Sequence, residues 1–308
     1  MKKWLGFALV VLLVSCALAQ SDNLHALRPY NGENPSPLSG CYGGTACELN
    51  YHSGPVLTTA PTVYILYYGD WTSTDMGIIN TYFQDLGGST QEKTNTRYSD
   101  STGKYINGKI NFDPAKDTYQ DPYSMGKNLS DIQPVIAAAI KKKHLPNDTN
   151  GVYIGITYKD VKYGQMCTGY CGYHGPSTSI VKGETIKYAF VGDPGQCVDS
   201  CSYEFMYGTH ASPNNDIDAD GSINIMWHEF SESSSDPLVN AWYSEVGYES
   251  GDLCAWLDLK YKVDKNGNYY TVLTDGHEYL TQMMFELNEK SRNGSVPGTC
   301  ENTYKNLH

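Results

Sequence analysis

Short apolar runs and stretches of helical spacing alternate along the chain. Residues 62–68, TVYILYY, are β-branched and aromatic and end at Gly69, which predicts a buried strand. Residues 152–158 and 186–191 have the same character and predict two further strands. Strands that are separated by helical segments are typical of an α/β or α+β layer.

Helical spacing recurs in four segments, residues 76–86, 130–140, 223–235 and 278–289. Thr74-Asp75 is placed to cap the first of these helices. Because strands and helices are interleaved, we expect one disulfide-stabilised α/β or α+β domain.

The first 19 residues predict a secretory signal peptide. Lys2 and Lys3 form its positive end, residues 4–14 its apolar stretch, and Ala17-Leu18-Ala19 its cleavage site. No later apolar run approaches the roughly 20 residues of a membrane span. The sequence therefore predicts a secreted protein, extracellular or associated with the cell wall.

The remaining chain divides by composition into three parts. Residues 20–40 are rich in Pro, Asn, Ser and Gly, which predicts an extended or disordered lead. Residues 41–300 show no linker or repeat, so we treat them as one domain, and residues 301–308 as a tail.

Cysteine usage agrees with secretion. The chain has nine cysteines, and loss of Cys16 with the signal peptide leaves an even number. An even number in a secreted chain predicts disulfides, although the sequence does not choose among about 105 connectivities. The disulfide candidates are Cys41, Cys47, Cys167, Cys171, Cys197, Cys201, Cys254 and Cys300.

Three sequons predict glycosylation sites if the host is eukaryotic. They begin at Asn128, Asn147 and Asn293.

The formal net charge is −12, and no stripe of Lys and Arg is present. This argues against nucleic acid or an anionic membrane as partner. The 26 tyrosines could stack on sugars but also suit half-buried positions. We expect an extracellular peptide or polysaccharide as partner, and the sequence leaves the oligomeric state open.

The segment 216–237, DIDADGSINIMWHEFSESSSDP, contains the strongest candidate chemistry. On a helix, His228 and Glu232 lie four residues apart on one face and present two metal ligands. Glu229 would then act as the catalytic general base toward metal-bound water. The pattern predicts a metal site, with zinc as the favoured ion.

The sequence offers two candidates for a further ligand of this metal site. Asp236 ends the predicted helix before Pro237 and is either a ligand or a turn-former. His174 lies between two glycines in a predicted loop, from which it could reach the helix.

Asp216, Asp218 and Asp220, followed by Gly221, have the spacing of a calcium loop. The twelfth position, where such loops need an acid, is Trp227. The alternative is an Asp-rich turn that caps the following helix. Calcium is therefore a second candidate ion.

Other catalytic patterns are missing from the sequence. It has no Gly-x-Ser-x-Gly elbow and no phosphate-binding glycine loop.

Several short strings follow one another along the chain in a recognisable order and spacing. They are Tyr51-His-Ser-Gly-Pro-Val-Leu, Tyr64-Ile-Leu-Tyr-Tyr-Gly-Asp-Trp71, Cys171-Gly-Tyr-His-Gly175, Val191-Gly-Asp-Pro-Gly-Gln-Cys197 with Cys201, Ser212-Pro-Asn-Asn-Asp-Ile-Asp-Ala-Asp-Gly221, Asp236-Pro and Asn240-Ala-Trp-Tyr243. Together these strings resemble the exordium-like (phosphate-induced protein) family. The resemblance implies an extracellular or cell-wall location and, in plants, a link to growth control without an established chemistry.

The HE-x-x-E string departs from the plant pattern and resembles a microbial branch of the family. It favours a metal-dependent hydrolase that cleaves an amide, less readily an ester, on a zincin-like central sheet with a metal-site helix. The alternative is a non-catalytic extracellular protein that binds wall or matrix polysaccharide through Trp71, Trp242 and Trp256.

Overall fold

The computed structural model describes residues 26–30, 47–288 and 295–301. Its central sheet has five strands in the order β3-β2-β5-β8-β7. Four of them run parallel, while β7 is an edge strand antiparallel to β8. The strands are β2 (Val63–Tyr68), β3 (Thr118–Asp121), β5 (Val152–Thr157), β7 (Gly172–Ser177) and β8 (Ile186–Gly192).

The three predicted strands are confirmed as β2, β5 and β8, the centre of this sheet. Every residue of the three is buried, as expected for parallel strands that are covered on both faces. The sequence did not reveal β3 or β7, because both are edge strands with polar residues or Gly and Pro.

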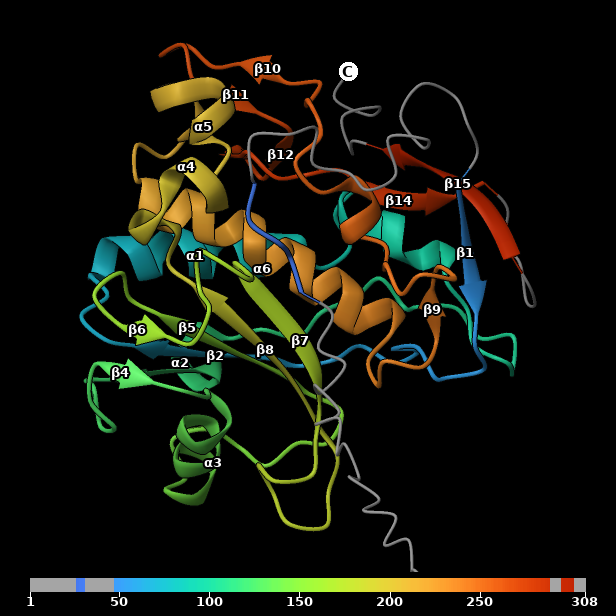
Figure 1. Cartoon of the computed structure of the whole chain (residues 1–308), viewed down its shortest axis with the longest axis horizontal. Helices are drawn as coiled ribbons and strands as arrows, with labels where there is room; N and C mark the ends of the chain where they lie inside the picture. The colour runs from blue at the N-terminus through green and yellow to red at the C-terminus, as the bar shows by residue number, and fades with distance from the viewer. Residues whose placement is uncertain (1–25, 31–46, 289–294, 302–308) are drawn as a thin grey trace, which may run out of the picture.

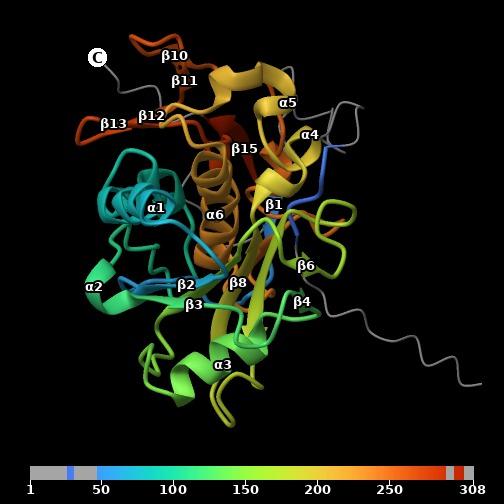
Figure 2. The ribbon, with the colours of Figure 1, turned by 90° about the vertical axis from the view of Figure 1, so that its left-hand side faces the viewer.

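Helices cover both faces of the central sheet. In two views at right angles, α1 (Ser73–Leu86) and α6 (Ile217–Ser235) lie on one side and α3 (Gln133–Lys141) on the other (Figures 1 and 2). Gly155 on β5 admits α3 closely, since a Cβ there would lie 2.3 Å from Ile132. The mixed α/β class is therefore confirmed.

Both helices near the candidate site begin earlier than predicted. Thr72, not Thr74-Asp75, caps α1, and it forms a capping box with Asp75. The α6 helix begins at Ile217 instead of residue 223, because the Asp216 side chain accepts a hydrogen bond from Ala219 N–H. The Asp-rich segment thus belongs to the first turn of α6.

The predicted helix over 278–289 is wrong. This region forms β13 (His277–Tyr279) and β14 (Met284–Leu287), and β14 pairs antiparallel with the strand that follows it in the chain, which the spacing within residues 278–289 cannot reveal. The resulting second sheet has the order β14-β15-β1-β9 and lies beside the C-terminal part of α6 (Figure 1). Its other strands are β15 (Ser295–Glu301), β1 (Cys47–Tyr51) and β9 (Trp242–Tyr243).

Short elements connect these layers. The helical turns are η1 (Glu92–Arg97), α2 (Pro114–Asp117), η2 (Pro194–Gln196), α4 (Val198–Cys201), α5 (Glu204–Tyr207), η3 (Gly208–Ala211) and η4 (Asp252–Cys254). The paired short strands are β4 (Asn128–Leu129) with β6 (Lys162–Tyr163), β10 (Lys262–Val263) with β11 (Tyr269–Tyr270), and β12 (Val272–Thr274) with β13.

Disulfides join six of the eight predicted cysteines. Two of them tie the start of β7 to α4, and the third ties η4 to β15. Cys41 and the side chain of Cys47 lie outside the described part. The pairs are Cys167–Cys197, Cys171–Cys201 and Cys254–Cys300.

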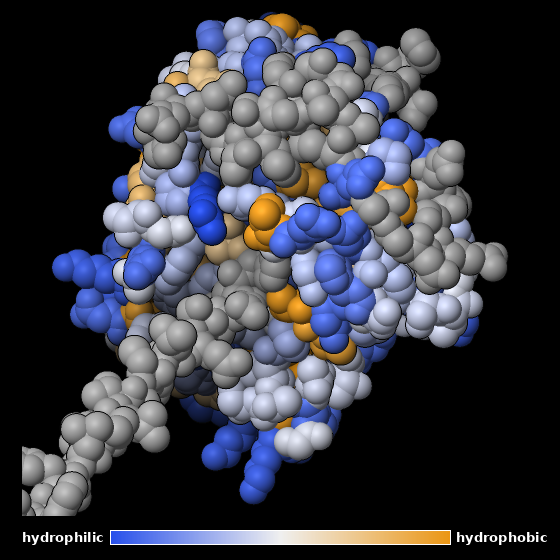
Figure 3. Space-filling model, turned by 45° about the vertical axis from the view of Figure 1, so that its right-hand side comes forward, coloured by the Kyte–Doolittle hydropathy of each residue, from blue (hydrophilic) through white to orange (hydrophobic). Residues whose placement is uncertain are grey.

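The ends of the chain are only partly described. The predicted signal peptide, most of the lead and residues 302–308 lie outside the described ranges. Residues 26–30 of the lead are not isolated, since Leu27 is 0% exposed against the domain. No helix in the described part is long and apolar enough to cross a membrane. Figure 3 shows hydrophobic residues as small, scattered groups on one face of the molecule.

Candidate metal centre

The C-terminal half of α6 is buried although it is rich in polar side chains. His228 and Glu232 share one face of the helix, with 3.2 Å between His228 Nε2 and Glu232 Oε1. Both side chains are 0% exposed. Two metal-ligating groups therefore meet inside the protein, where a buried charge needs a partner.

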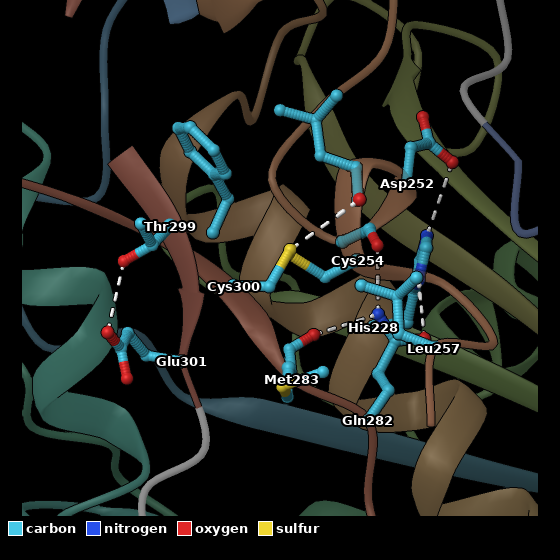
Figure 4. Close-up of a disulfide and its surroundings, with 12 residues drawn as sticks. His228, Asp252, Cys254, Leu257, Gln282, Met283, Thr299, Cys300 and Glu301 are labelled. Atoms are coloured by element: carbon cyan, nitrogen blue, oxygen red, sulfur yellow. Dashed lines mark hydrogen bonds and ion pairs between the residues drawn. A yellow bond between two sulfur atoms is a disulfide. The ribbon is translucent and has the colours of Figure 1, made fainter. Parts of the chain in front are cut away.

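Gln282 orients the His228 ring (Figure 4). Its Nε2 donates to the carbonyls of Gly251 (2.9 Å) and Met283 (3.2 Å), so its Oε1 must be the atom that lies 3.1 Å from His228 Nδ1. His228 Nδ1 therefore donates the proton, and a neutral ring leaves Nε2 as the acceptor or ligand atom.

His174 lies on strand β7 and not in a loop as predicted. Its Nε2 is 2.9 Å from Glu249 Oε2 and 3.7 Å from Glu232 Oε2. The sheet thus brings His174 to the same carboxylate that His228 contacts from the helix.

Glu249 and Asp252 were missed in the sequence. Glu249 lies between β9 and η4 and Asp252 is the first residue of η4, in a stretch that has no recognisable ligand spacing. Backbone N–H groups of Gly251 and Asp252 each donate to Glu232 Oε1 at 3.0 Å. Asp252 Oδ1 also lies 3.7 Å from His228 Nε2, as Figure 4 shows.

Two glycines let the surrounding backbone approach the cluster. A Cβ at position 251 would lie 2.7 Å from His228 Nδ1 and 2.9 Å from Glu232 Oε1. A Cβ at position 172 would lie 2.8 Å from Glu229 Oε1. Any side chain at Gly172 or Gly251 would therefore collide with the cluster.

Glu229 is 0% exposed, and neither carboxylate oxygen completes a well-formed hydrogen bond within the described part. Burial raises its pKa well above the usual range, and Glu232 raises it further. His228 and the neighbouring backbone N–H of Leu27 lower it in part. Such a carboxyl group holds or releases a proton according to the nearby charge.

The other acids respond in the same way. Burial and then Glu232 raise the pKa of Glu249 well above normal and that of Asp252 to about 7. Burial alone would lower the pKa of His228, but Glu232 and the other acids raise it to about 10. Where no metal ion is bound, protons supply the positive charge that this cluster of carboxylates requires.

Asp236 ends α6, as predicted, and organises the following turn. Its Oδ1 accepts from the N–H groups of Asn240 (2.6 Å) and Ala241 (2.7 Å). Burial raises its pKa to about 6, and hydrogen bonding to Glu249 opposes this rise. Asp236 thus lies at the border of the cluster with a turn-forming role of its own.

Two sets of ligand atoms lie within 4.8 Å of one another in the described part of the chain, and Glu232 belongs to both. One set comprises His174, Glu232 and Glu249, the other His228, Glu229 and Glu232.

The three residues of the predicted calcium loop do not converge. Asp216 caps α6, and Asp218 forms an ion pair with Lys159. Asp220 accepts hydrogen bonds from the Ser212 hydroxyl and from both nitrogens of Asn214. Each carboxylate already has a partner.

The tryptophans predicted to bind sugar are buried. Trp71, Trp242 and Trp256 are 3%, 0% and 3% exposed, so none offers a stacking surface. Of the sequon residues, Asn128 and Asn147 are exposed, and Asn293 lies outside the described residues.

Comparison with known proteins identifies the family. Residues 49–293 match the phosphate-induced protein 1 conserved region. The chain belongs to this family. It is 31% identical to Protein EXORDIUM-like 5 of Arabidopsis thaliana over 80% of this chain and 77% of that protein. Protein EXORDIUM-like 3 of the same plant is 32% identical, over 76% and 75%.

Protein PHOSPHATE-INDUCED 1 of Nicotiana tabacum is 26% identical over 77% of this chain and 85% of its own length. The predicted family membership is therefore confirmed. No solved structure matches this chain.

Proposed function

We propose that this member of the phosphate-induced protein 1 family is a secreted, metal-dependent hydrolase that cleaves an amide bond. The proposal depends on one observation. Glu229 is completely buried beside His228 and Glu232, and both of its oxygens lack a well-formed hydrogen bond within the described residues. Such an acid is costly unless an ion, a proton or a substrate satisfies it.

The residues fit a zinc ion. His228 Nε2 and Glu232 would be ligands, and Glu232 also belongs to the second set of ligand atoms, with His174 and Glu249. We therefore favour His174, which faces the other oxygen of Glu232, over Asp236, whose Oδ1 is held by backbone N–H groups. Two imidazoles with carboxylates are typical zinc ligands. Zinc would lower the pKa of a bound water. We favour zinc over calcium because Asp216, Asp218 and Asp220 each have another partner.

Protein groups then perform the proton transfer. Glu229 accepts a proton from the attacking water and delivers it to the departing nitrogen. Gln282 holds His228 in the required tautomer. A central sheet packed against the helix that carries the His–Glu pair supports the zincin-like arrangement.

The test combines metal content and turnover. Wild type, Glu229→Gln and the exposed control Glu245→Gln are purified without chelator, analysed for bound metal and screened against peptide and ester libraries. Glu229→Gln should retain the ion and lose about 10²–10⁴ in rate. Glu245→Gln should match the wild type.

Two results would overturn the proposal. One is a wild type that neither contains nor takes up zinc, and the other is equal turnover in wild type and Glu229→Gln. Secretion is tested separately by the N-terminus of exported protein, which we expect at Gln20.

A further inference from the structure

The proposed catalytic cluster is sealed from solvent. The side chains of His174, His228 and Glu229 are all 0% exposed, so a polymeric substrate reaches them only if a covering segment moves. Residues 26–30 form such a segment, since Leu27 is also 0% exposed and is hydrogen-bonded to Cys171, next to Gly172, whose backbone lies against Glu229. Figure 1 shows this segment, in strong blue, crossing α6 beside the first part of β7.

The segment is attached through its backbone at the edge of the central sheet. The Leu27 carbonyl accepts a hydrogen bond from Cys171 N–H at 2.7 Å, and Cys171 directly precedes the edge strand β7. Trp256 Nε1 donates to the carbonyl of Arg28 at 2.6 Å. Addition of an extended chain to a sheet edge is a common mode of peptide recognition. Any extended peptide carries these same backbone groups.

The side chains of residues 26–30 contact separate parts of the domain. Tyr30 stacks on Phe205 with 3.9 Å between ring centroids, and its N–H donates to the Ser200 carbonyl at 2.8 Å. The Arg28 guanidinium lies 5.9 Å from the centroid of the Tyr248 ring. With the buried Leu27, the segment therefore offers an apolar, a cationic and an aromatic contact in sequence.

We propose that residues 26–30 occupy the groove that binds an extended peptide substrate, so that the chain's own N-terminal segment inhibits the enzyme. This inference rests on the proposed hydrolase function. Because the buried Leu27 is held at Cys171, directly beside the Gly172 backbone that packs against Glu229, the groove selects a leucine-like residue that supplies the nitrogen of the cleaved bond. Water adds to the preceding carbonyl carbon, the C–N bond breaks, and Glu229 transfers the proton to that nitrogen.

The first experiment displaces the segment in the zinc-loaded mature protein. Leu27→Asp places a charge in the apolar position, and Tyr30→Ala removes the stack at the other end. Val263→Asp, on the exposed part of β10, is the matched control. A tethered competitor acts at an effective concentration in the millimolar range, so both segment variants should raise kcat/KM on leucine-containing peptides at least about tenfold. Val263→Asp should equal the wild type.

The second experiment adds the segment in trans. Acetyl-Ala-Leu-Arg-Pro-Tyr-amide should bind Tyr30→Ala in calorimetry and inhibit it competitively, while the same peptide with Asp in place of Leu should do neither. A new N-terminus at Leu27 in zinc-loaded wild type, absent from Glu229→Gln, would support the same register.

The outcomes separate this inference from the hydrolase proposal. Equal activity of wild type and both segment variants overturns the inhibitory segment and leaves the hydrolase intact. If no variant cleaves any peptide although zinc is bound, the hydrolase proposal fails. In that case, binding of the peptide to Tyr30→Ala tests the proposed groove independently of turnover, and absence of binding overturns the groove. Tyr30→Ala keeps the test valid if Leu27→Asp does not fold.

Discussion

The two ends of α6 are both rich in acids, but the structure uses them differently. At the N-terminal end, Asp216 caps the helix, Asp218 pairs with Lys159 and Asp220 accepts three hydrogen bonds. Asp218 and Asp220 also lie in the first turn, where the helix dipole favours negative charge.

At the C-terminal end, Glu229 and Glu232 lie with two histidines and further acids in a fully buried cluster. Most partners come from distant parts of the chain, since His174 and Glu249 are 75 residues apart. A high density of acidic residues therefore does not by itself indicate a functional site. A candidate site stands out where buried acids converge from distant parts of the chain.

The largest expected difference between the two ends is in metal content. His228→Ala should lose the bound zinc, because it removes a ligand, whereas Asp218→Asn should retain it. Elemental analysis of both variants measures this. Saturating zinc at about 1,000 times its Kd should also stabilise the wild type by about 4 kcal/mol.

A different result would place the ion site at the N-terminal end of α6. If added Ca²⁺ raised the unfolding temperature of the wild type but not of Asp218→Asn, the N-terminal end would be the ion site.

Glu92 tests how a single buried acid behaves beside the same helix. Burial raises its pKa to about 8, opposed by the Asn95 side chain. The folded state therefore binds the proton more tightly than the unfolded chain, and its stability contribution falls as pH rises from about 4.5 to 8. Glu92→Gln should remove this loss, a gain of up to about 5 kcal/mol above pH 8.

Urea unfolding of wild type and Glu92→Gln at pH 5, 7 and 9 gives the difference. A constant difference across this range would show that Glu92 does not titrate on folding.

Asp220 measures the cost of removing a satisfied acid. Asp220→Ala leaves Ser212 and Asn214 without their buried acceptor and should destabilise the protein by about 3 kcal/mol. Zinc content should be unchanged. Asp220→Asn, which retains one acceptor, should cost less in the same denaturant titration.

The smallest effect is expected at the Lys159–Asp218 ion pair, where the lysine side chain is 44% exposed. Lys159→Met should cost less than about 1 kcal/mol, and the difference should shrink at high salt. A larger, salt-independent loss would mean that this end of α6 depends on charge more than its exposure suggests.

The local sequence pattern correctly predicted those helices and strands that local interactions determine. The runs that became β2, β5 and β8 are apolar throughout, and the spacing of His228 and Glu232 follows from helical geometry. The predicted helix over residues 278–289 was wrong because Met284–Leu287 is stabilised by antiparallel pairing with β15, whose residues lie outside that segment.

The family, the mixed α/β class and the residues that α6 presents follow from the amino-acid sequence alone. Which acids share a site depends on how distant parts of the chain pack together. His174 reaches Glu232 because β7 is antiparallel at the sheet edge, and Glu249 and Asp252 arrive from a segment without any motif. The physical reason is that burial and convergence depend on long-range packing, while spacing along the chain records only the local backbone period.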